Sequence, residues 1–403
     1  MLSIYFLFTA ILSLTVDPWR INNTPLSLDT LDASREISST VRVGKAALAN
    51  KGEWHTVMFG SSRVEMAFDP NHPAFGGKKT VNLAMSAANI LELVPSANYA
   101  LDRNPDIKLI LFGIDAGDLH DDFDSRKFTH FYESPFADNN ISIERGINQV
   151  IGGRALIDSI GTISRHFHGE TPERTPLGHW VRANHPQNLR LYVQSAIQMG
   201  FESSNKAWSV NEQNLRFQKA DLLKGLLRRV RNDGIEMHLF VPPQHALKLI
   251  HPETNRPQKM CWDEDLQALA KICSKVNEIA APGPPIRLWS FLTFNEYTMR
   301  PLPGVGPGLM QMDSWNDLGH AQTDFGNAAI ETMLAGNKGT ATQQNPVGIE
   351  LHLGDWDSLR ATWISQHEDY CIRRSGDVDW WRTLIRKAIE DKVESREMAE
   401  EQR

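Results

Sequence analysis

The amino-acid sequence predicts an α/β protein built on a doubly wound parallel sheet of about five strands. Two observations carry this prediction: short apolar runs recur along the chain, and amphipathic helical stretches separate them. Each run has the length of a strand and lacks strict alternation, which is typical of strands covered on both faces. Strands that alternate with helices favour a parallel sheet with helices on both of its faces.

Five runs are expected to form the strands: HTVMFG (55–60), KTVNLAM (79–85), IKLILFGID (107–115), IEMHLFVPP (235–243) and IRLWSFL (286–292). Helices are expected over 86–103, 211–234 and 263–281, because apolar residues recur there at helical spacing. Gly234 follows a last turn that holds arginines, which is a sound C-terminal signal. A further helix is expected over 27–50, with Asp29 or Thr30 as its N-cap.

The N-terminal stretch LSIYFLFTAILSLTV, residues 2–16, is an uninterrupted apolar run that ends at Asp17-Pro18. It is shorter than the roughly 20 residues that usually span a bilayer. It also lacks the positive n-region and the A-x-A site of a signal peptide. A buried helix is the alternative, but the density of Phe, Leu and Ile favours a membrane anchor or uncleaved signal over residues 1–18. The residues that follow would then lie outside the cytoplasm.

The composition sets broad limits on the class of protein. The chain has 403 residues and a net charge of −7, so no basic surplus is present to attract nucleic acid or anionic lipid. Cys261, Cys273 and Cys371 fit neither a disulfide framework nor a zinc pattern. A bridge between Cys261 and Cys273 is one alternative, and packed free thiols are favoured.

Two segments interrupt the α/β pattern and define the expected organisation. Residues 120–210 form a long insertion, and a connection of this length usually makes a cap or binding surface. Residues 19–119 and 211–336 would then be the two parts of one domain. Residues 337–403 are expected to be a linker and a C-terminal helical extension, which contains Trp356, Trp363, Trp380 and Trp381.

Paired hydroxyls stand at the predicted carboxyl end of the first strand, in Gly60-Ser61-Ser62. Ligands of such sheets bind at the carboxyl ends of the strands. A serine becomes a nucleophile only when a base takes its proton and a third group orients that base. Asp317 and His320 stand three residues apart, just before a helix expected to begin near Thr323. That spacing lets the carboxylate reach the imidazole and fix its tautomer.

These segments resemble the SGNH (GDSL-type) hydrolase superfamily. Gly60-Ser61-Ser62 looks like its first block, with Ser61 where the family usually has Asp, and Asp317-Leu-Gly-His320 looks like its last block. More narrowly, GSSRV, VNLAMSAANI, LFGIDAGDL and IEMHLFVPPQHA resemble membrane-anchored, extracytoplasmic members. Those members serve exopolysaccharide or cell-wall modification, in the style of alginate O-acetyltransferases and the teichoic-acid D-alanylation protein. The resemblance covers residues 50–120 and 235–335 and implies a flavodoxin-like sheet.

The resemblance also implies roles for particular residues. Ser62 would be the nucleophile, His320 the general base and Asp317 the group that orients it. The oxyanion donor of the second block would be a backbone N–H at Ser86 or Ala87. Asp115 stands where the family has an Asn donor, and an ionised carboxylate there would repel the oxyanion. Loss of one such donor costs on the order of 10²–10³ in rate. Asp115 is therefore protonated, or it binds another group, or the chain is an inefficient hydrolase.

Two further side chains are expected near the same rim. Arg63 could bind a substrate carboxylate or phosphate, although an ion pair with Asp115 or Asp118 is slightly favoured. His245, in VPPQHA after the fourth strand, could contact substrate or act as an alternative base. A loop histidine held by the two prolines is the simpler interpretation of His245.

Metal sites and cofactors are not expected. The segment 117–124 has clustered Asp residues, but it lacks the glycine and glutamate of an EF-hand, so a solvated acidic loop is favoured over a calcium site. His166, His168 and Glu170 lack a convincing further ligand.

The sequence thus leads to two hypotheses of different class. The first is a serine-dependent acyl-ester transferase or esterase that acts on a cell-surface or exported polysaccharide through an acyl-serine. Its partners would be a glycan or acyl donor and a membrane-bound acyltransferase, with no nucleic acid. The alternative is a catalytically weak or inactive scaffold protein that uses the cap and the Trp-rich tail as binding surfaces. A phosphate-handling protein ranks low, because a Gly-rich cradle and a Walker lysine are absent from the sequence.

Overall fold

The computed structural model describes residues 2–19, 26–35, 41–51, 53–137, 147, 150–181, 189–190, 192–194, 214–250, 264–304, 312–335 and 346–401, with only the backbone for 392–401. Its centre is a six-stranded sheet in the order β2-β1-β3-β4-β5-β8. The strands are β1 (Thr56–Phe59), β2 (Thr80–Asn82), β3 (Leu109–Gly113), β4 (Glu236–Val241), β5 (Arg287–Ser290) and β8 (Ile349–Glu350). The first five are parallel, and each lies in one of the five predicted runs.

The sixth strand was not predicted from the sequence. β8 is two residues long and pairs antiparallel with β5, with Ser290 opposite Ile349. Arg287 on β5 adds a bidentate ion pair with Glu350. A strand of two residues is too short to show a hydrophobic pattern in the sequence. It is identified only by its pairing with β5.

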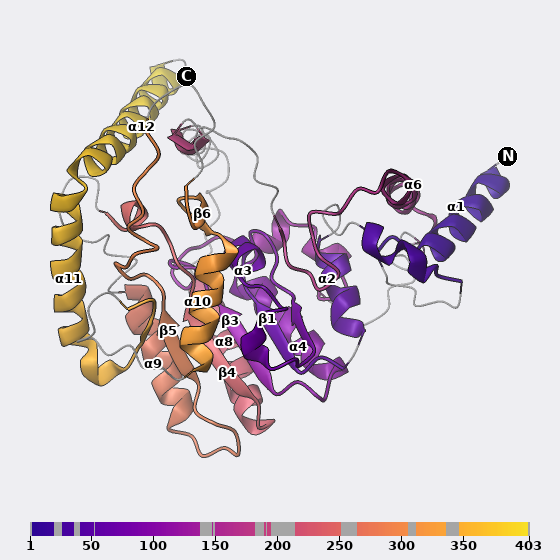
Figure 1. Ribbon diagram of the computed structural model, residues 1–403, viewed down its shortest axis with the longest axis horizontal. Coiled ribbons are helices and arrows are strands. Elements are labelled where there is room, and N and C mark those ends of the chain that lie inside the picture. The colour runs from indigo at the N-terminus through magenta and orange to yellow at the C-terminus, as the bar shows by residue number, and fades with distance from the viewer. Residues whose placement is uncertain are drawn as a thin grey trace.

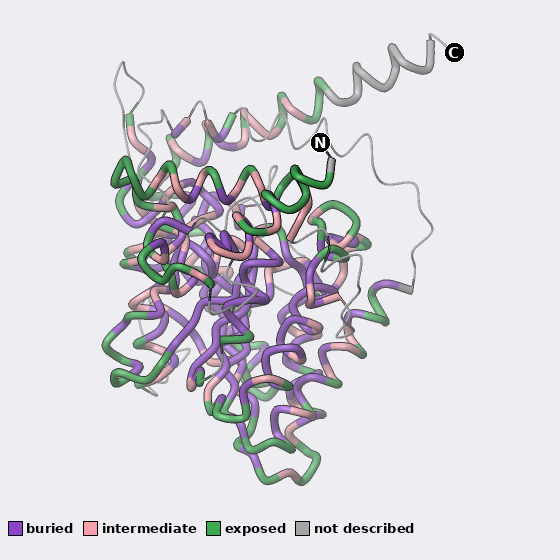
Figure 2. Tube along the Cα trace, turned by 90° about the vertical axis from the view of Figure 1, so that its right-hand side faces the viewer, coloured by how far each residue is buried: buried purple, intermediate pink, exposed green. Residues whose placement is uncertain are grey.

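Helices form two layers around the sheet. The helices α2 (Val41–Asn50), α4 (Ile90–Arg103), α8 (Asn214–Asn232) and α9 (Asp265–Asn277) contact one another in succession. The helices α3 (Ser62–Ala67) and α10 (Thr323–Leu334) contact each other separately, and α10 crosses in front of the strands in Figure 1. All four residues of β1 are buried, as the absence of alternation predicted. Figure 2 shows this buried interior beneath exposed helices and loops.

The long helix expected over 27–50 is wrong. The structure has a short 3-10 helix, η1 (Asp29–Ser34), and then α2 from Val41. Arg35 between them is extended, and its guanidinium donates to the carbonyls of Val16 and Leu28 and to Ser27. These hydrogen bonds satisfy carbonyls of the preceding segment and turn the chain out of the helix.

The described parts of the insertion 120–210 lie in four places rather than in one body. One of them, around Arg190, hydrogen-bonds to the Pro303 carbonyl and to Asp377. The 3-10 helices η4 (Ser125–Lys127) and η5 (Phe131–Glu133) contact each other, and η4 lies against α4. The helix α6 (Gly153–His168) packs on α1. The segment 171–181 runs beside β2, where the Asn82 N–H donates to the Leu177 carbonyl at 2.9 Å.

The C-terminal extension belongs to the core. After β8 come η8 (Leu353–Asp355), α11 (Trp356–Arg373) and α12 (Ser375–Glu401), which form the arm that ends at the C-terminus in Figure 1. Trp356 and Trp363 pack edge to face, and Tyr370 packs on Phe294. Trp356, Trp363 and Trp381 are buried and Trp380 is partly buried, so the Trp-rich tail is not the open binding surface that the scaffold hypothesis requires. The expected linker, 337–346, lies almost wholly outside the described residues.

The N-terminal apolar run forms α1 (Leu2–Val16), which projects from the body of the molecule beside α6 (Figure 1). Among the described residues, no helix combines the length and the apolar character needed to cross a bilayer. Cys273 and Cys371 are buried free thiols, and burial raises the pKa of Cys273 to about 12. Cys261 lies outside the described residues.

Gly326 lets α10 lie close to α3. A Cβ on Gly326 would lie 1.8 Å from the carbonyl oxygen of Ala67, which is backbone and cannot rotate away. We expect Gly326→Ala to lower the free energy of unfolding by at least about 2 kcal/mol, measured by urea denaturation.

Gly225 in α8 is the matched control, because a Cβ there meets nothing within 4 Å. Gly225→Ala should raise stability by about 0.5–1 kcal/mol, since alanine restricts the unfolded chain and favours helix. Equal stability of the two variants would show that α3 and α10 are not held at this distance.

Candidate active site

A tight turn presents Ser62 at the carboxyl end of β1. Gly60 is required there because a Cβ would lie 2.3 Å from Cγ2 of Val64, in the first turn of α3. Ser61 is the N-cap of α3, and its Oγ accepts a hydrogen bond from the Arg63 N–H. Ser62 is the first helical residue, so its N–H has no acceptor within the helix. The turn therefore places Ser62 at the carboxyl end of β1, with an N–H for which the helix offers no acceptor.

The structure brings Ser62, His320 and Asp317 together. Oγ of Ser62 lies 2.8 Å from Nε2 of His320. Nδ1 of the same imidazole lies 2.8 and 2.9 Å from the two carboxylate oxygens of Asp317. A carboxylate can only accept, so the proton of the neutral imidazole is on Nδ1 and Nε2 accepts from the serine hydroxyl. The residues come from segments some 250 positions apart, as the sequence predicted for this pair of motifs.

A short hairpin holds the acid and the base. Asp317 ends β6 (Trp315–Asp317) and His320 begins β7 (His320–Ala321), and the two strands pair antiparallel. The Gly319 N–H donates to Asp317 at 2.8 Å. Burial alone would raise the pKa of Asp317, but hydrogen bonds from His320 and Gly319 and the charge of Lys248 outweigh it and hold that pKa below its ordinary value. Asp317 is therefore ionised beside the imidazole at neutral pH.

Arg63 and Asp115 form an ion pair at the same edge. The Arg63 guanidinium contacts Asp115 and also donates from Nε to the Gly319 carbonyl at 3.0 Å. Ser61 donates to the other oxygen of Asp115 at 2.9 Å. Asp115 is thus an acceptor for two groups of α3 and is not oriented as a donor to an oxyanion. Asp118, the other expected partner of Arg63, instead forms an ion pair with Lys219 and accepts a hydrogen bond from the Ile90 N–H.

The loop with Ser86 and Ala87 lies next to the serine turn. The Met85 N–H donates to the Gly60 carbonyl at 2.8 Å, which ties this loop to the turn after β1. Ala87 has φ 58°, a left-handed conformation that favours glycine, so the backbone there is set against the preference of the residue. The Ser86 hydroxyl points inward and donates to Glu65 at 3.0 Å, and its carbonyl accepts from Arg42.

Beneath this loop lies a buried ionic cluster that the sequence did not reveal. Glu65 is fully buried between Lys45, at 3.3 Å, and Arg174, at 2.8 Å, and both cations are buried as well. Burial would raise the pKa of Glu65, but the two cations outweigh this effect and lower it. Burial lowers the pKa of Lys45 to about 8. In the sequence, Glu65 stands three residues after Ser62, and that spacing matches a capping box. It would suggest an exposed helix start and not a buried charge.

The His245 side chain does not reach the rim, so the alternative of a contact with substrate is wrong and the simpler interpretation, a histidine held within its loop, agrees with the structure. The side chain is buried, with Nε2 2.8 Å from the Arg300 carbonyl and Nδ1 accepting from the Leu247 N–H. Its backbone N–H donates to the Leu318 carbonyl, between the acid and the base. His245 is therefore a support of the β6–β7 hairpin, and it caps the 3-10 helix η6 (Ala246–Leu249).

The candidate cation ligands are engaged with protein groups or lie apart. Lys219 pairs with Asp118 and Asp121, and Arg126 pairs with Asp124. Burial raises the pKa of Asp118 to about 7. His166, His168 and Glu170 are exposed at the end of α6. Over the described ranges, no group of three or more His, Cys, Asp or Glu side chains is arranged to hold a metal ion.

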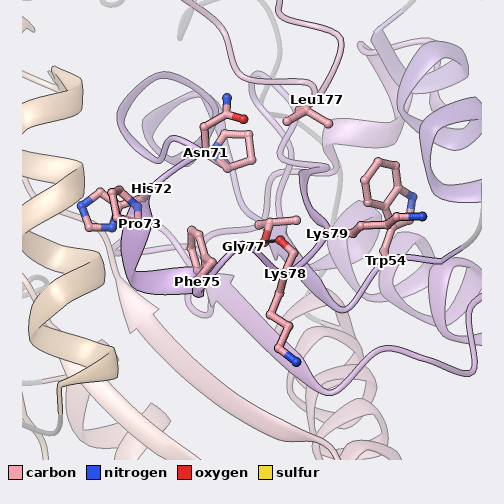
Figure 3. Close-up of a pocket in the computed structure, with 11 residues that line it drawn as sticks. Trp54, Asn71, His72, Pro73, Phe75, Gly77, Lys78, Lys79 and Leu177 are labelled. Carbon is pink, nitrogen blue, oxygen red and sulfur yellow. Dashed lines mark hydrogen bonds between the residues drawn. The ribbon is translucent and has the colours of Figure 1, made fainter.

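A cavity of about 400 Å³ lies at the other end of the sheet (Figure 3). Its lining comes from Trp54, which precedes β1, and from the segment that leads through the 3-10 helix η3 (Pro73–Phe75) into β2. Ser62 follows the carboxyl end of β1, whereas this cavity borders the amino ends of β1 and β2. It is therefore separate from the serine, histidine and aspartate.

Removing the carboxylate of Glu65 from the ionic cluster should lower the stability of the fold strongly. Glu65→Gln leaves Lys45 and Arg174 buried without a counter-charge, so the free energy of unfolding should fall by about 3–5 kcal/mol in urea denaturation. Glu53→Gln is the matched control, since Glu53 also pairs with a lysine but on the open surface, and it should change stability little. A Glu65 variant as stable as the control would mean that the cluster is hydrated.

The buried His245 predicts a pH dependence of stability. Burial lowers the pKa of His245 from 6.5 to about 4, so between these values the unfolded chain binds a proton that the folded protein does not. The native state therefore loses up to about 3 kcal/mol as the pH falls from 6.5 to 4, and nothing above 6.5.

The variant His245→Gln removes this proton and retains a donor for the Arg300 carbonyl. Its stability should change less steeply than that of the unsubstituted chain between pH 6.5 and 4, although it is lower at pH 7. The measurement is urea denaturation across this pH range. Parallel curves for the two proteins would place His245 in contact with solvent.

Comparisons with family models, with curated proteins and with solved structures found no match for the chain. The arrangement around Ser62 is therefore interpreted from its own geometry. It consists of a hydroxyl, an imidazole and a carboxylate in hydrogen-bonded series at the carboxyl edge of a parallel sheet.

Proposed function

We propose that the chain is a serine-dependent acyl-ester transferase or esterase. The observation that carries the proposal is the continuous hydrogen-bonded series from Ser62 Oγ through His320 to Asp317, with distances of 2.8, 2.8 and 2.9 Å. A hydroxyl, a base with the required tautomer and a group that orients the base are the three parts that nucleophilic catalysis by serine needs.

In the first step, His320 Nε2 takes the hydroxyl proton as Ser62 Oγ attacks the ester carbonyl. Asp317 stabilises the imidazolium that forms, because its carboxylate is already ionised and hydrogen-bonded to Nδ1. The imidazolium then gives its proton to the leaving alkoxide, and the acyl group remains on Ser62. In the second step, His320 deprotonates water or a sugar hydroxyl, which attacks the acyl-serine and restores the free serine.

Backbone N–H groups are the proposed oxyanion donors. The N–H of Ser62 is unpaired by its position at the start of α3, and the loop at Ser86 and Ala87 is tied to the same turn through Met85 and Gly60. Asp115 contributes no donor, since it accepts from Ser61 and pairs with Arg63. The oxyanion site thus has fewer donors than one with an asparagine side chain, so we expect slow turnover of simple esters.

The fold and the sequence blocks support a more specific proposal. The strand order β2-β1-β3-β4-β5 is compatible with a flavodoxin-like sheet and supports that proposal. The serine, aspartate and histidine also follow one another along the chain as in the SGNH superfamily that the sequence resembles. By this resemblance the substrate is an exported or cell-surface polysaccharide. The protein would lie on the extracytoplasmic side, held by its N-terminal segment, and a membrane-bound acyltransferase would supply the acyl group.

A second candidate is a catalytically weak scaffold of an exopolysaccharide assembly system. The ion pair of Asp115 with Arg63 favours it, because both side chains are used to join segments of the protein. The two candidates differ in whether Ser62 reacts with an electrophile.

The test is labelling by a serine-directed fluorophosphonate together with release of nitrophenol from p-nitrophenyl acetate. We expect the unsubstituted chain to be labelled by the fluorophosphonate and to release nitrophenol, and we expect Ser62→Ala to do neither. His320→Gln should reduce each rate by 10³-fold or more, on the order of the loss of a triad member.

Ser164→Ala is the matched control, because Ser164 Oγ also lies near a histidine nitrogen, 3.4 Å from His168 Nδ1, but on an exposed helix without the acid. It should label and turn over like the unsubstituted chain. If no protein in the series reacts, the scaffold becomes the better proposal, and if Ser62→Ala reacts normally, another group is the nucleophile.

A further inference from the structure

The first half of α1 exposes large apolar side chains all round the helix. Ile4 and Leu7 are 72% and 63% exposed, and Tyr5, Phe6 and Phe8 between and beside them are exposed as well. Five consecutive residues cover more than one full turn of about 3.6 residues. A groove of a partner protein covers one side of a helix, whereas a fluid hydrocarbon phase covers its whole circumference. The exposure of α1 therefore fits lipid better than it fits a protein groove.

A second exposed apolar face lies on α6, more than 140 residues further along the chain. Ile157, Ile160 and Phe167 are 64%, 54% and 81% exposed. Their spacing of three and seven residues places them on one side of the helix. In Figure 1, α6 and α1 lie side by side, away from the sheet.

α1 and α6 contact each other, and the side chains that they bury are mostly small. On α1 the buried positions include Thr9 and Ser13, and on α6 they are Ala155, Ser159 and Thr162. Small buried residues are typical of helices that associate in lipid, where large apolar side chains gain nothing by leaving the solvent. The large apolar residues of the pair accordingly point outward, which reverses the arrangement usual for helices in water.

Hydrogen bonds fix α6 relative to the chain that follows α1. The Trp19 indole donates to Asp158 at 2.9 Å, and the Arg165 guanidinium donates to the Ser34 carbonyl at 2.9 Å. The exposed face of α6 is therefore held at a set position beside α1 and does not turn independently of it.

We propose that Ile157, Ile160 and Phe167 of α6 form a second membrane contact beside α1, so that the pair embeds in one leaflet as a unit. The occupant of this face is the acyl-chain region of a bilayer. This contact goes beyond anchoring by the N-terminus, because two non-collinear helices fix the orientation of the domain on the membrane. It does not depend on the chemistry of Ser62.

The test is flotation of the full chain with phosphatidylcholine vesicles. The triple variant Ile157→Ser, Ile160→Ser, Phe167→Ser should bind vesicles roughly 10- to 100-fold more weakly than the unsubstituted chain. The reason is that three apolar side chains, each partly embedded in lipid, are lost from the contact. The matched control changes three apolar residues that are exposed elsewhere, Phe217→Ser, Ile279→Ser and Ile372→Ser, and should bind like the unsubstituted chain.

A second measurement separates lipid from a protein partner. An environment-sensitive fluorophore on Ile160→Cys should shift to the blue on vesicle binding and be quenched by nitroxide-labelled lipid, whereas one on Ile372→Cys should do neither. Light scattering of the triple variant without vesicles gives the oligomeric state.

Three results would overturn the proposal. Equal vesicle binding by the α6 variant and the control would leave α1 as the sole contact. A fluorophore at residue 160 that vesicles do not affect would exclude lipid from α6. A change of oligomeric state in the α6 variant, with no vesicle binding by any protein, would assign this face to a second copy of the chain.

Discussion

The arrangement at the carboxyl edge of the sheet depends on one guanidinium. Arg63 leaves the first turn of α3, pairs with Asp115 at the end of β3 and donates to the carbonyl of Gly319 between the acid and the base. It thereby joins the three segments that carry the hydroxyl, the strand end and the imidazole. Ser62 precedes Arg63 directly, so these contacts lie beside the nucleophile. Asp115 has a structural role here, because its charge is the counterpart of Arg63.

A second constraint lies one layer deeper, under the loop of Ser86 and Ala87. Glu65, Lys45 and Arg174 bring charges into the interior from α3, α2 and the segment beside β2. Replacing such a cluster by apolar residues is often neutral or favourable for stability, so stability alone does not account for its presence. Its geometry accounts for more: Ser86 hydrogen-bonds to Glu65, and Ala87 keeps a left-handed backbone. The buried charges hold this loop in one position, whereas apolar packing alone would hold it less specifically.

The sequence predicted the elements whose signal is local and missed those that depend on a partner. The five parallel strands are apolar runs with a local signal. Ser62 could be paired with the distant Asp317 and His320 because the order of these motifs resembles that of the SGNH superfamily. Glu65 and Lys45 gave no signal, since charged residues usually face water and only a partner far along the chain reveals the exception. The break at Arg35, the two-residue strand β8 and the burial of His245 were missed for the same reason. The scaffold hypothesis used the tail tryptophans as a surface, and composition does not distinguish core from exposed aromatic residues.

Both borders of the sheet are covered by segments from outside the five-stranded unit. On one border the N–H of Asn82 in β2 reaches the Leu177 carbonyl, and on the other β8 pairs with β5. Uncovered backbone at such borders is a template on which further chains can add as strands and grow into aggregates. These two short segments therefore protect the sheet against aggregation through its edges. A shortened chain that keeps the five strands but lacks 171–181 and 346–350 would expose unpaired strand edges on both sides.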